Sequence, residues 1–155
     1  YSMESLDILA EVAHSCGAQI AVEDLPRTCL GNTADEILRL ISVNDKLRVC
    51  FDTNHLLEYN DDNLNFLEKL GDKLITLHVS DYDRLDEKHW LPGEGVVDWQ
   101  ELYSAILKTG YNGVWMYEIG LKPPKTLSRS RDLVFDDFVR NAREIFENKS
   151  LTVIK

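Results

Sequence analysis

Amphipathic helical segments alternate with short apolar segments along the whole chain, and this alternation restricts the fold more than any other feature. Apolar residues at helical spacing predict helices, and short apolar runs between polar or glycine residues predict strands. The predicted helices cover 1–16, 34–43, 61–70, 99–108 and 131–148, and the predicted strands cover 18–23, 47–52, 74–78 and 113–118. Strict alternation of this kind predicts an α/β domain built on a parallel sheet with right-handed crossovers.

Capping residues mark several of the predicted helix ends. Thr33 followed by Glu36, and Asp98 followed by Glu101, have the spacing of capping boxes at helix starts. Glycines stand where three helices should end: Gly17, Gly71 and Gly110. With 155 residues and 44% apolar content, the chain is long enough to form one domain with a substantial core.

The net charge of the chain is −10. A field of this sign repels nucleic acid and attracts cations, so we expect no nucleic-acid partner. A merely solvated acidic surface is the alternative explanation of the charge. No apolar run approaches the ~18 residues that a membrane-spanning helix needs, so we expect no membrane partner.

The chain has three cysteines, Cys16, Cys29 and Cys50, and no CxxC motif. An odd number without that spacing predicts neither a disulfide framework nor a zinc finger. Cys50 lies in a predicted strand, where we expect a buried thiol. Free thiols fit a reducing compartment, so we expect a cytoplasmic protein.

Each predicted strand ends on a group that can bind a metal or move a proton: Glu23, Asp52, His78 and Glu118. The carboxyl ends of parallel strands open on one face of the sheet, so these four side chains should converge. Three carboxylates and one imidazole suit a divalent ion, because without a cation the carboxylates would repel one another. The alternative is that they are separate helix caps and surface charges.

The motifs around these groups resemble a known family. Glu23 lies in VEDLP, Asp52 and His55 in FDTNH, His78 in LHVSD, and Glu118 in YEIG, while PGEGVVDW fills 92–99. Together they resemble the xylose-isomerase-like TIM-barrel superfamily. The resemblance implies a parallel (β/α) TIM-barrel fold. It places residues 1–155 in the C-terminal half of a (β/α)8 barrel, strands five to eight with their helices.

The resemblance also implies a chemistry and assigns roles to residues. One divalent ion (Mn²⁺, Mg²⁺, Co²⁺ or Zn²⁺) would be held by Glu23, Asp52, His78 and Glu118. A small sugar or sugar phosphate would be isomerised or epimerised through a metal-stabilised enediolate, with Glu23 and Glu118 as base and acid. The expected substrate-binding residues are His55, Arg84 and His89. Taken alone, His55 could be a structural histidine and Arg84 a surface ion pair.

Other activities of the same superfamily stay open. A keto-inositol dehydratase shares the enediolate step and then expels a hydroxyl. An abasic-site endonuclease uses a cluster of three zinc ions, and Glu87-x-His89 resembles its Asp-x-His ligand pair, with Glu in place of Asp. The sparse basic residues and the negative charge count against DNA binding. An inactive metal-binding fragment is the non-enzymatic alternative.

Half a barrel leaves two open sheet edges and an uncovered apolar layer. We therefore expect either that the missing N-terminal half-barrel completes this chain or that two copies pair as a homo-oligomer.

Overall fold

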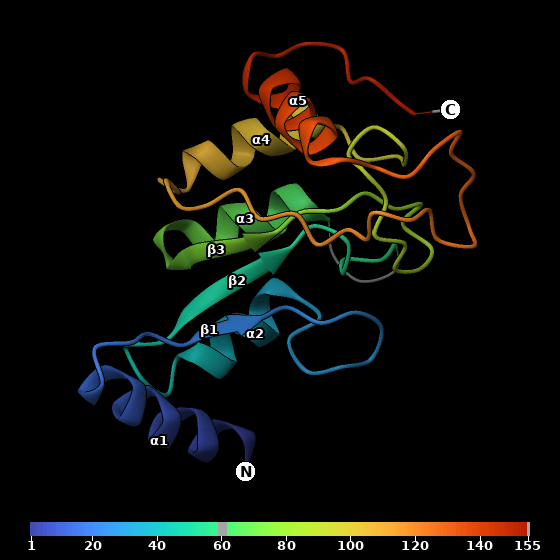
Figure 1. Ribbon diagram of the computed structural model, residues 1–155. Helices are drawn as coiled ribbons and strands as arrows, with labels where there is room; N and C mark the ends of the chain where they lie inside the picture. Colours follow the sequence, from blue (N-terminus) through green and yellow to red (C-terminus); the bar gives the residue numbers. More distant parts are fainter. Residues whose placement is uncertain (59–61, 155) are drawn as a thin grey trace.

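The computed structural model describes residues 1–58 and 62–154. Its sheet has three parallel strands in the spatial order β1 (Ala21–Glu23), β2 (Arg48–Asp52) and β3 (Leu74–His78). The helices are α1 (Ser2–Ser15), α2 (Ala34–Ile41), α3 (Asn63–Leu70), α4 (Trp99–Lys108) and α5 (Phe135–Phe146), with a 3₁₀ turn at Gly71–Lys73. The predicted alternation of helices with parallel strands is confirmed, and the strands all point toward the end where the long loops gather (Figure 1).

The predicted fourth strand over 113–118 is wrong as an element. The segment forms a single parallel bridge, between Tyr117 and Val79, instead of a continuous ladder. Two backbone hydrogen bonds make this bridge, from Val79 N–H to Met116 O at 2.8 Å and from Glu118 N–H to Val79 O at 3.1 Å. The segment therefore runs beside the carboxyl end of β3 but is attached to the sheet at one point only.

Helix boundaries follow the capping side chains. Asp98 accepts hydrogen bonds from the N–H groups of Gln100 and Glu101, so α4 begins where predicted. The expected capping box at Thr33 is only half formed: Thr33 Oγ1 accepts from Glu36 N–H, whereas the Glu36 carboxylate accepts from Gly31 N–H.

Two other predicted helix starts differ from the structure. The last helix was expected from residue 131 and begins at Phe135, because the Asp137 carboxylate accepts the Val134 N–H and fixes the start there. The predicted start at Asp61 lies outside the described residues, and Asp62 caps α3 through its side chain. The first strand begins at Ala21 rather than at residue 18.

The helices cover one face of the sheet. Side chains of β2 and β3 that point toward the helices, such as Val49, Phe51 and Leu77, are fully buried. They pack in one cluster with Ile37 of α2, Phe66 of α3 and the side chains of α4 and α5. Because side chains alternate along a strand, Cys50, Asp52, Thr76 and His78 point to the opposite face. That opposite face corresponds to the inside of a barrel.

Apolar side chains are exposed beside both edges of the sheet. On α1, beside the β1 edge, Ile8 is 65% exposed and Val12 is 56% exposed. Beside the β3 edge, Val114 is 68% exposed and Phe135 of α5 is 81% exposed. Exposed apolar faces flanking an open sheet are what a partial barrel leaves uncovered. Within 1–58 and 62–154, no helix is long and apolar enough to cross a membrane.

Candidate metal centre

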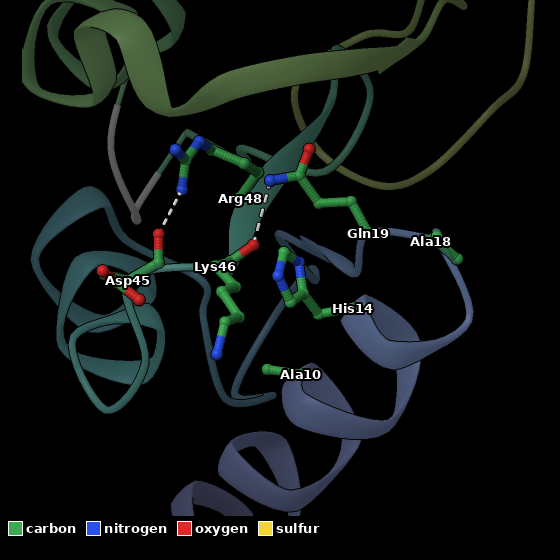
Figure 2. Close-up of a pocket in the computed structure, with 8 residues that line it drawn as sticks. Ala10, His14, Ala18, Gln19, Asp45, Lys46 and Arg48 are labelled. Carbon is green, nitrogen blue, oxygen red and sulfur yellow. Dashed lines mark hydrogen bonds between the residues drawn. The ribbon is translucent and has the colours of Figure 1, made fainter.

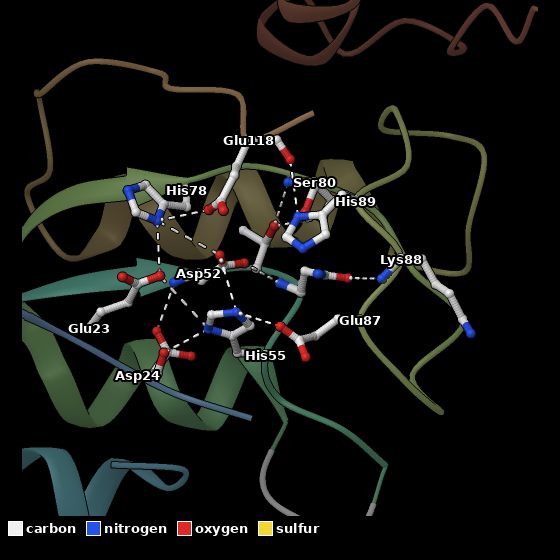
Figure 3. A network of polar contacts seen from close by, with 12 residues as sticks. Glu23, Asp24, Asp52, His55, His78, Ser80, Glu87, Lys88, His89 and Glu118 are labelled. Carbon is white, nitrogen blue, oxygen red and sulfur yellow. Dashed lines mark hydrogen bonds and ion pairs between the residues drawn. The ribbon is translucent and has the colours of Figure 1, made fainter. Parts of the chain in front are cut away.

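The four strand-end groups Glu23, Asp52, His78 and Glu118 lie together at the carboxyl end of the sheet (Figure 3). One potential ligand atom from each lies within 4.8 Å of the corresponding atoms of the others. Three of the groups come from β1, β2 and β3, and Glu118 comes from the extended segment bridged to β3. The parallel register therefore brings together residues that are up to 95 positions apart in the sequence.

His78 lies between two carboxylates. Its Nδ1 is 2.9 Å from Glu23 Oε1 and 3.0 Å from Glu118 Oε2. The same nitrogen is 3.8 Å from Asp52 Oδ2. All three carboxylates thus face one ring nitrogen, in the arrangement of donors that would surround a shared cation.

Asp52 is the buried member of this cluster. Its side chain is fully buried, and its Oδ1 accepts the Asn54 N–H at 2.8 Å. Its Oδ2 has no hydrogen-bond partner. Burial raises the pKa of Asp52 to about 8, aided by the negative charges of Glu118 and Glu23. A buried carboxylate without a compensating donor is costly, and a divalent cation would remove that cost.

Local structure fixes the position of Asp52. As the last residue of β2 it pairs in register with His78, the last residue of β3. Just beyond the strands, Thr53 Oγ1 donates to Ser80 O at 2.7 Å and accepts from Ser80 N–H at 3.0 Å. This buried pair joins the two strand ends and holds Asp52 and His78 level with each other.

His55 and Asp24 lie beneath the cluster (Figure 3). His55 is 6% exposed, its Nδ1 is 2.7 Å from Asp24 O, and its Nε2 is 3.6 Å from Asp52 Oδ2. The Asp24 carboxylate is fully buried and accepts the Asp52 N–H at 2.7 Å, while its Oδ2 is unpaired. Burial raises the pKa of Asp24 well above its usual range; the hydrogen bond from the Asp52 N–H opposes this rise, and the negative charge of Asp52 adds to it. His55 therefore contacts the cluster with a ring whose Nδ1 is already occupied.

The loop after β3 closes over the same end of the sheet. Glu87 Oε1 is 3.3 Å from His55 Nε2, and His89 Nδ1 is 3.1 Å from the backbone oxygen of Glu118. Arg27, in the loop after β1, forms ion pairs with Asp86 and Glu87. The structure thus places His55, Glu87 and His89 beside the cluster, and Arg27 links the two loops.

Arg84 is placed differently from the other predicted substrate-binding residues. Among the described residues it lines a hollow of about 460 Å³ with Asp62, Asn63 and Asp98, between the starts of α3 and α4. Its backbone is in the left-handed region, with φ 63°. Its predicted contact with substrate would require this part of the loop to turn toward the cluster.

The segment 92–99 is held by Asp81. This buried carboxylate accepts hydrogen bonds from the N–H groups of Tyr82, Gly93, Gly95 and Val97 and from Trp99 Nε1, at 2.8–3.2 Å. Gly95 has no room for a side chain, because a Cβ there would lie 2.2 Å from Tyr82 O and 2.3 Å from Asp81 Oδ1. The PGEGVVDW motif is therefore a loop wrapped around one carboxylate.

Family comparison agrees with this arrangement. A family model described as "Xylose isomerase-like TIM barrel" matches residues 1–136. The chain belongs to the xylose isomerase-like TIM-barrel family. The resemblance of the strand-end motifs to this family is thereby confirmed, as is the fold class.

Two sugar epimerases and an inosose dehydratase are similar to this chain. Fructoselysine 3-epimerase of Escherichia coli O157:H7 is 28% identical over 146 residues, which cover 86% of this chain and 53% of that protein. Inosose dehydratase of Lacticaseibacillus casei is 29% identical over 139 residues, covering 77% and 46%. A crystal structure of D-psicose 3-epimerase with D-tagatose, from Clostridium cellulolyticum H10, superposes with a TM-score of 0.65 at 28% identity, covering 77% and 41%. The chain spans about half the length of these relatives.

No role was predicted from the sequence for two carboxylates at the carboxyl end of the sheet, Asp24 and Asp81. Asp24 follows Glu23 directly, and a tandem acidic pair at a strand end was the available signal. Asp81 follows LHVS within a loop that holds several other acidic residues, so nothing in the sequence singled it out. Both are fully buried in the structure.

A separate hollow of about 600 Å³ lies at the opposite end of the strands, beside α1 (Figure 2). Gln19 Nε2 donates to Lys46 O at 3.0 Å across it, and His14 and Arg48 also line it. Members of the TIM-barrel fold place their active sites at the carboxyl ends of the strands. This hollow is therefore at the end of the strands opposite to the one where TIM-barrel proteins carry out their chemistry.

Proposed function

We propose that this chain carries the metal and proton-transfer centre of a divalent-metal-dependent sugar isomerase or epimerase. The observation that supports the proposal most directly is the convergence of Glu23, Asp52, His78 and Glu118 within 4.8 Å. The similarity to fructoselysine 3-epimerase and D-psicose 3-epimerase supports the substrate class, a small sugar. The family is established, and the activity of this chain is the proposal.

The residues at the site fit a divalent cation. Three carboxylates around one imidazole nitrogen form an oxygen-rich ligand set, which favours Mn²⁺, Mg²⁺, Co²⁺ or Zn²⁺. The unpaired Oδ2 of Asp52 is the strongest support, because it is buried among other negative charges. When bound, such an ion supplies Lewis-acid stabilisation of negative charge on substrate oxygens.

Glu23 and Glu118 are the proposed base and acid. Their carboxylates lie on either side of His78 Nδ1, at 2.9 and 3.0 Å, and they come from the first strand and from the last extended segment of the sheet. Their side chains are 31% and 48% exposed, so both can reach a substrate in the open face. One would remove the proton next to the carbonyl and the other would return it, from opposite faces in an epimerase.

His55 and His89 are proposed to orient substrate hydroxyls. His55 Nδ1 is bonded to Asp24 O, so Nε2, which faces Asp52 and Glu87, is the nitrogen left to bind a ligand. Arg84 is retained as a third substrate contact, dependent on movement of its loop.

The chain spans about half the length of its relatives. We propose that residues 1–155 are the C-terminal half of the barrel. A missing N-terminal half or a second copy would cover the exposed apolar side chains of α1 and α5. The three free cysteines support a reducing, cytoplasmic setting.

A keto-inositol dehydratase is the second candidate. It is favoured by the similarity to inosose dehydratase, which is as strong as the similarity to the epimerases. Both activities would use the same four groups and the same first proton transfer. Abasic-site cleavage is less favoured because the chain carries 27 acidic against 17 basic residues.

The test separates metal binding from proton transfer. We expect the chain to bind one Mn²⁺ by titration calorimetry and, when active, to exchange the carbon-bound proton of a ketose such as D-tagatose with D₂O. Glu118→Gln should retain the ion and lose exchange by ~10²–10⁴-fold, because an amide cannot accept the proton. Glu68→Gln, an exposed glutamate on α3, is the matched control. Undiminished exchange in Glu118→Gln would rule out its role.

A further inference from the structure

Cys50 lies next to the proposed metal centre but belongs to none of the roles described so far. It is on β2, two residues before Asp52, so both side chains point to the same face of the sheet. Its thiol is free and the residue is 3% exposed. The other two cysteines, Cys16 and Cys29, are exposed and lie outside the sheet.

The strand register places Cys50 beside two of the four strand-end groups. Glu23 pairs with Cys50 across β1 and β2, whereas His78 pairs with Asp52 across β2 and β3. One potential ligand atom from each of Glu23, Cys50 and His78 lies within 4.8 Å of those of the other two residues. Residues two apart on a strand are separated by ~6.6 Å, so Cys50 and Asp52 lie at different depths along β2, level with Glu23 and with His78 respectively.

A second observation is a buried carboxylate oxygen beside this pair that accepts no hydrogen bond. Asp52 Oδ2 is fully buried, has no hydrogen-bond partner, and points toward His78 Nδ1 at 3.8 Å. The side chains of Glu23 and His78 are 31% and 27% exposed, so an ion can reach them from the open face. Two overlapping groups of potential ligands share this pair, one completed by Asp52 and Glu118 and the other by Cys50.

We propose that Glu23, Cys50 and His78 form a second, deeper metal position that takes a thiophilic divalent ion such as Zn²⁺ or Cd²⁺. The proposal shares Glu23 and His78 with the metal centre of the proposed function and so rests on their availability as ligands. A carboxylate, an imidazole and a thiolate form a mixed set that soft and borderline ions prefer, while Mg²⁺ and Mn²⁺ prefer the oxygen-rich set. On binding, the thiol proton leaves to solvent, a sulfur–metal bond forms, and no oxidation occurs.

Because the two positions share Glu23 and His78, an ion at one competes for the ligands of the other. A thiophilic ion bound at Cys50 would therefore weaken binding of the harder ion and act as an inhibitor of the centre. The identity of the bound ion would depend on which ion is offered, and Cys50 would be the residue that decides between them.

The experiment uses a C16S/C29S chain, in which Cys50 is the sole thiol. Cd²⁺ alone is titrated in, and the ultraviolet charge-transfer absorption of a cadmium thiolate is recorded. We expect one equivalent of Cd²⁺ to produce the absorption, and Cys50→Ser in the same background to abolish it and to weaken Cd²⁺ binding by roughly tenfold or more. Cys50→Ala, checked for folding by circular dichroism, repeats the test without a buried hydroxyl. No absorption in the C16S/C29S chain, or an equal absorption in both Cys50 variants, would overturn the proposal.

Two further measurements separate this proposal from the metal centre itself. Asp52→Asn should keep the cadmium thiolate absorption and lose Mn²⁺ binding, whereas Cys50→Ser should keep Mn²⁺ binding within about threefold. Mn²⁺ binding without a cadmium thiolate would overturn the deeper position and leave the proposed function standing. A cadmium thiolate in a chain that binds none of Mn²⁺, Mg²⁺ and Co²⁺, and that binds Zn²⁺ only through Cys50, would overturn the proposed function and support the deeper position.

Discussion

Asp81 and Asp52 are both buried carboxylates at the carboxyl end of the sheet, and the protein treats them in opposite ways. Asp81 accepts five hydrogen bonds, all from N–H groups. Asp52 accepts one through Oδ1, leaves Oδ2 unpaired and faces the carboxylates of Glu23 and Glu118. The difference shows that burial alone does not mark a functional acid: the fold surrounds Asp81 with N–H donors, whereas Asp52 Oδ2 has none.

The largest expected effect follows from removing the Asp81 carboxylate. In Asp81→Asn, an NH₂ group would face N–H donors that now lie within 3.0 Å of a carboxylate oxygen, so we expect a loss of ~3–5 kcal/mol of unfolding free energy. Urea denaturation measures it, and the loss should be the same with and without Mn²⁺. Asp83→Asn, in the same loop but partly exposed, should cost much less. A loss that Mn²⁺ restores would show that Asp81 belongs to the metal centre after all.

The second effect concerns binding rather than folding. Asp52→Asn removes a charged ligand, so we expect Mn²⁺ affinity to fall by about 100-fold, or ~2.7 kcal/mol, in titration calorimetry. The metal-free variant should be no less stable than the parent, because the lost charge is one that burial disfavours. Asp72→Asn, an exposed carboxylate, provides the control. Unchanged affinity would mean that Asp52 is only a structural acid like Asp81.

The third prediction is the pH dependence of the metal-free chain. Burial raises the pKa of Asp52 from 3.8 to about 8, so the folded state binds this proton more tightly than the unfolded state. The stabilisation that protonated Asp52 adds to the unfolding free energy is complete below pH 3.8 and is lost as the pH rises toward 8. The buried Asp24 changes the unfolding free energy in the same direction. The urea midpoint should therefore fall across this window, and less steeply in Asp52→Asn. Saturating Mn²⁺ should remove the fall, because the ion binds the ionised form; a midpoint that rises across the window would contradict the assignment.

The smallest effect is expected for the link between the two loops. Arg27 pairs with Asp86 and Glu87 at the surface, where solvent screens ion pairs. Arg27→Ala should leave the urea midpoint unchanged within error and should alter only the salt dependence of sugar binding. A clear loss of stability would show that the loops depend on this contact more than on the Asp81 network.

The sequence predicted the parts of the site that depend only on strand register. Glu23, Asp52 and His78 end their strands, and parallel pairing places strand ends together whatever the loops do. Loop geometry could not be predicted in this way. Arg84 occupies a left-handed backbone position and lies between α3 and α4, and the five donors around Asp81 come from residues up to 18 positions away.

The prediction of a fourth strand was wrong for a related reason. Its apolar residues have strand character, but strand pairing needs a partner along its whole length, and the structure gives the 113–118 segment a single bridge. Val114 and Met116 remain exposed on it, at 68% and 47%. The local sequence was compatible with a strand, while the ladder depends on long-range contacts.

That single bridge has a consequence for how an ion would enter and leave. Three of the proposed ligands stand on strands joined by several consecutive pairs, whereas the segment that carries Glu118 is attached by two backbone hydrogen bonds. Glu118 is thus the proposed ligand whose backbone can detach from the sheet at the lowest free-energy cost, so we expect it to move first when an ion enters or leaves. Amide deuteration at Val79 and Glu118 should run ahead of that at Phe51 and Leu77, and a bound cation should slow it most at Glu118.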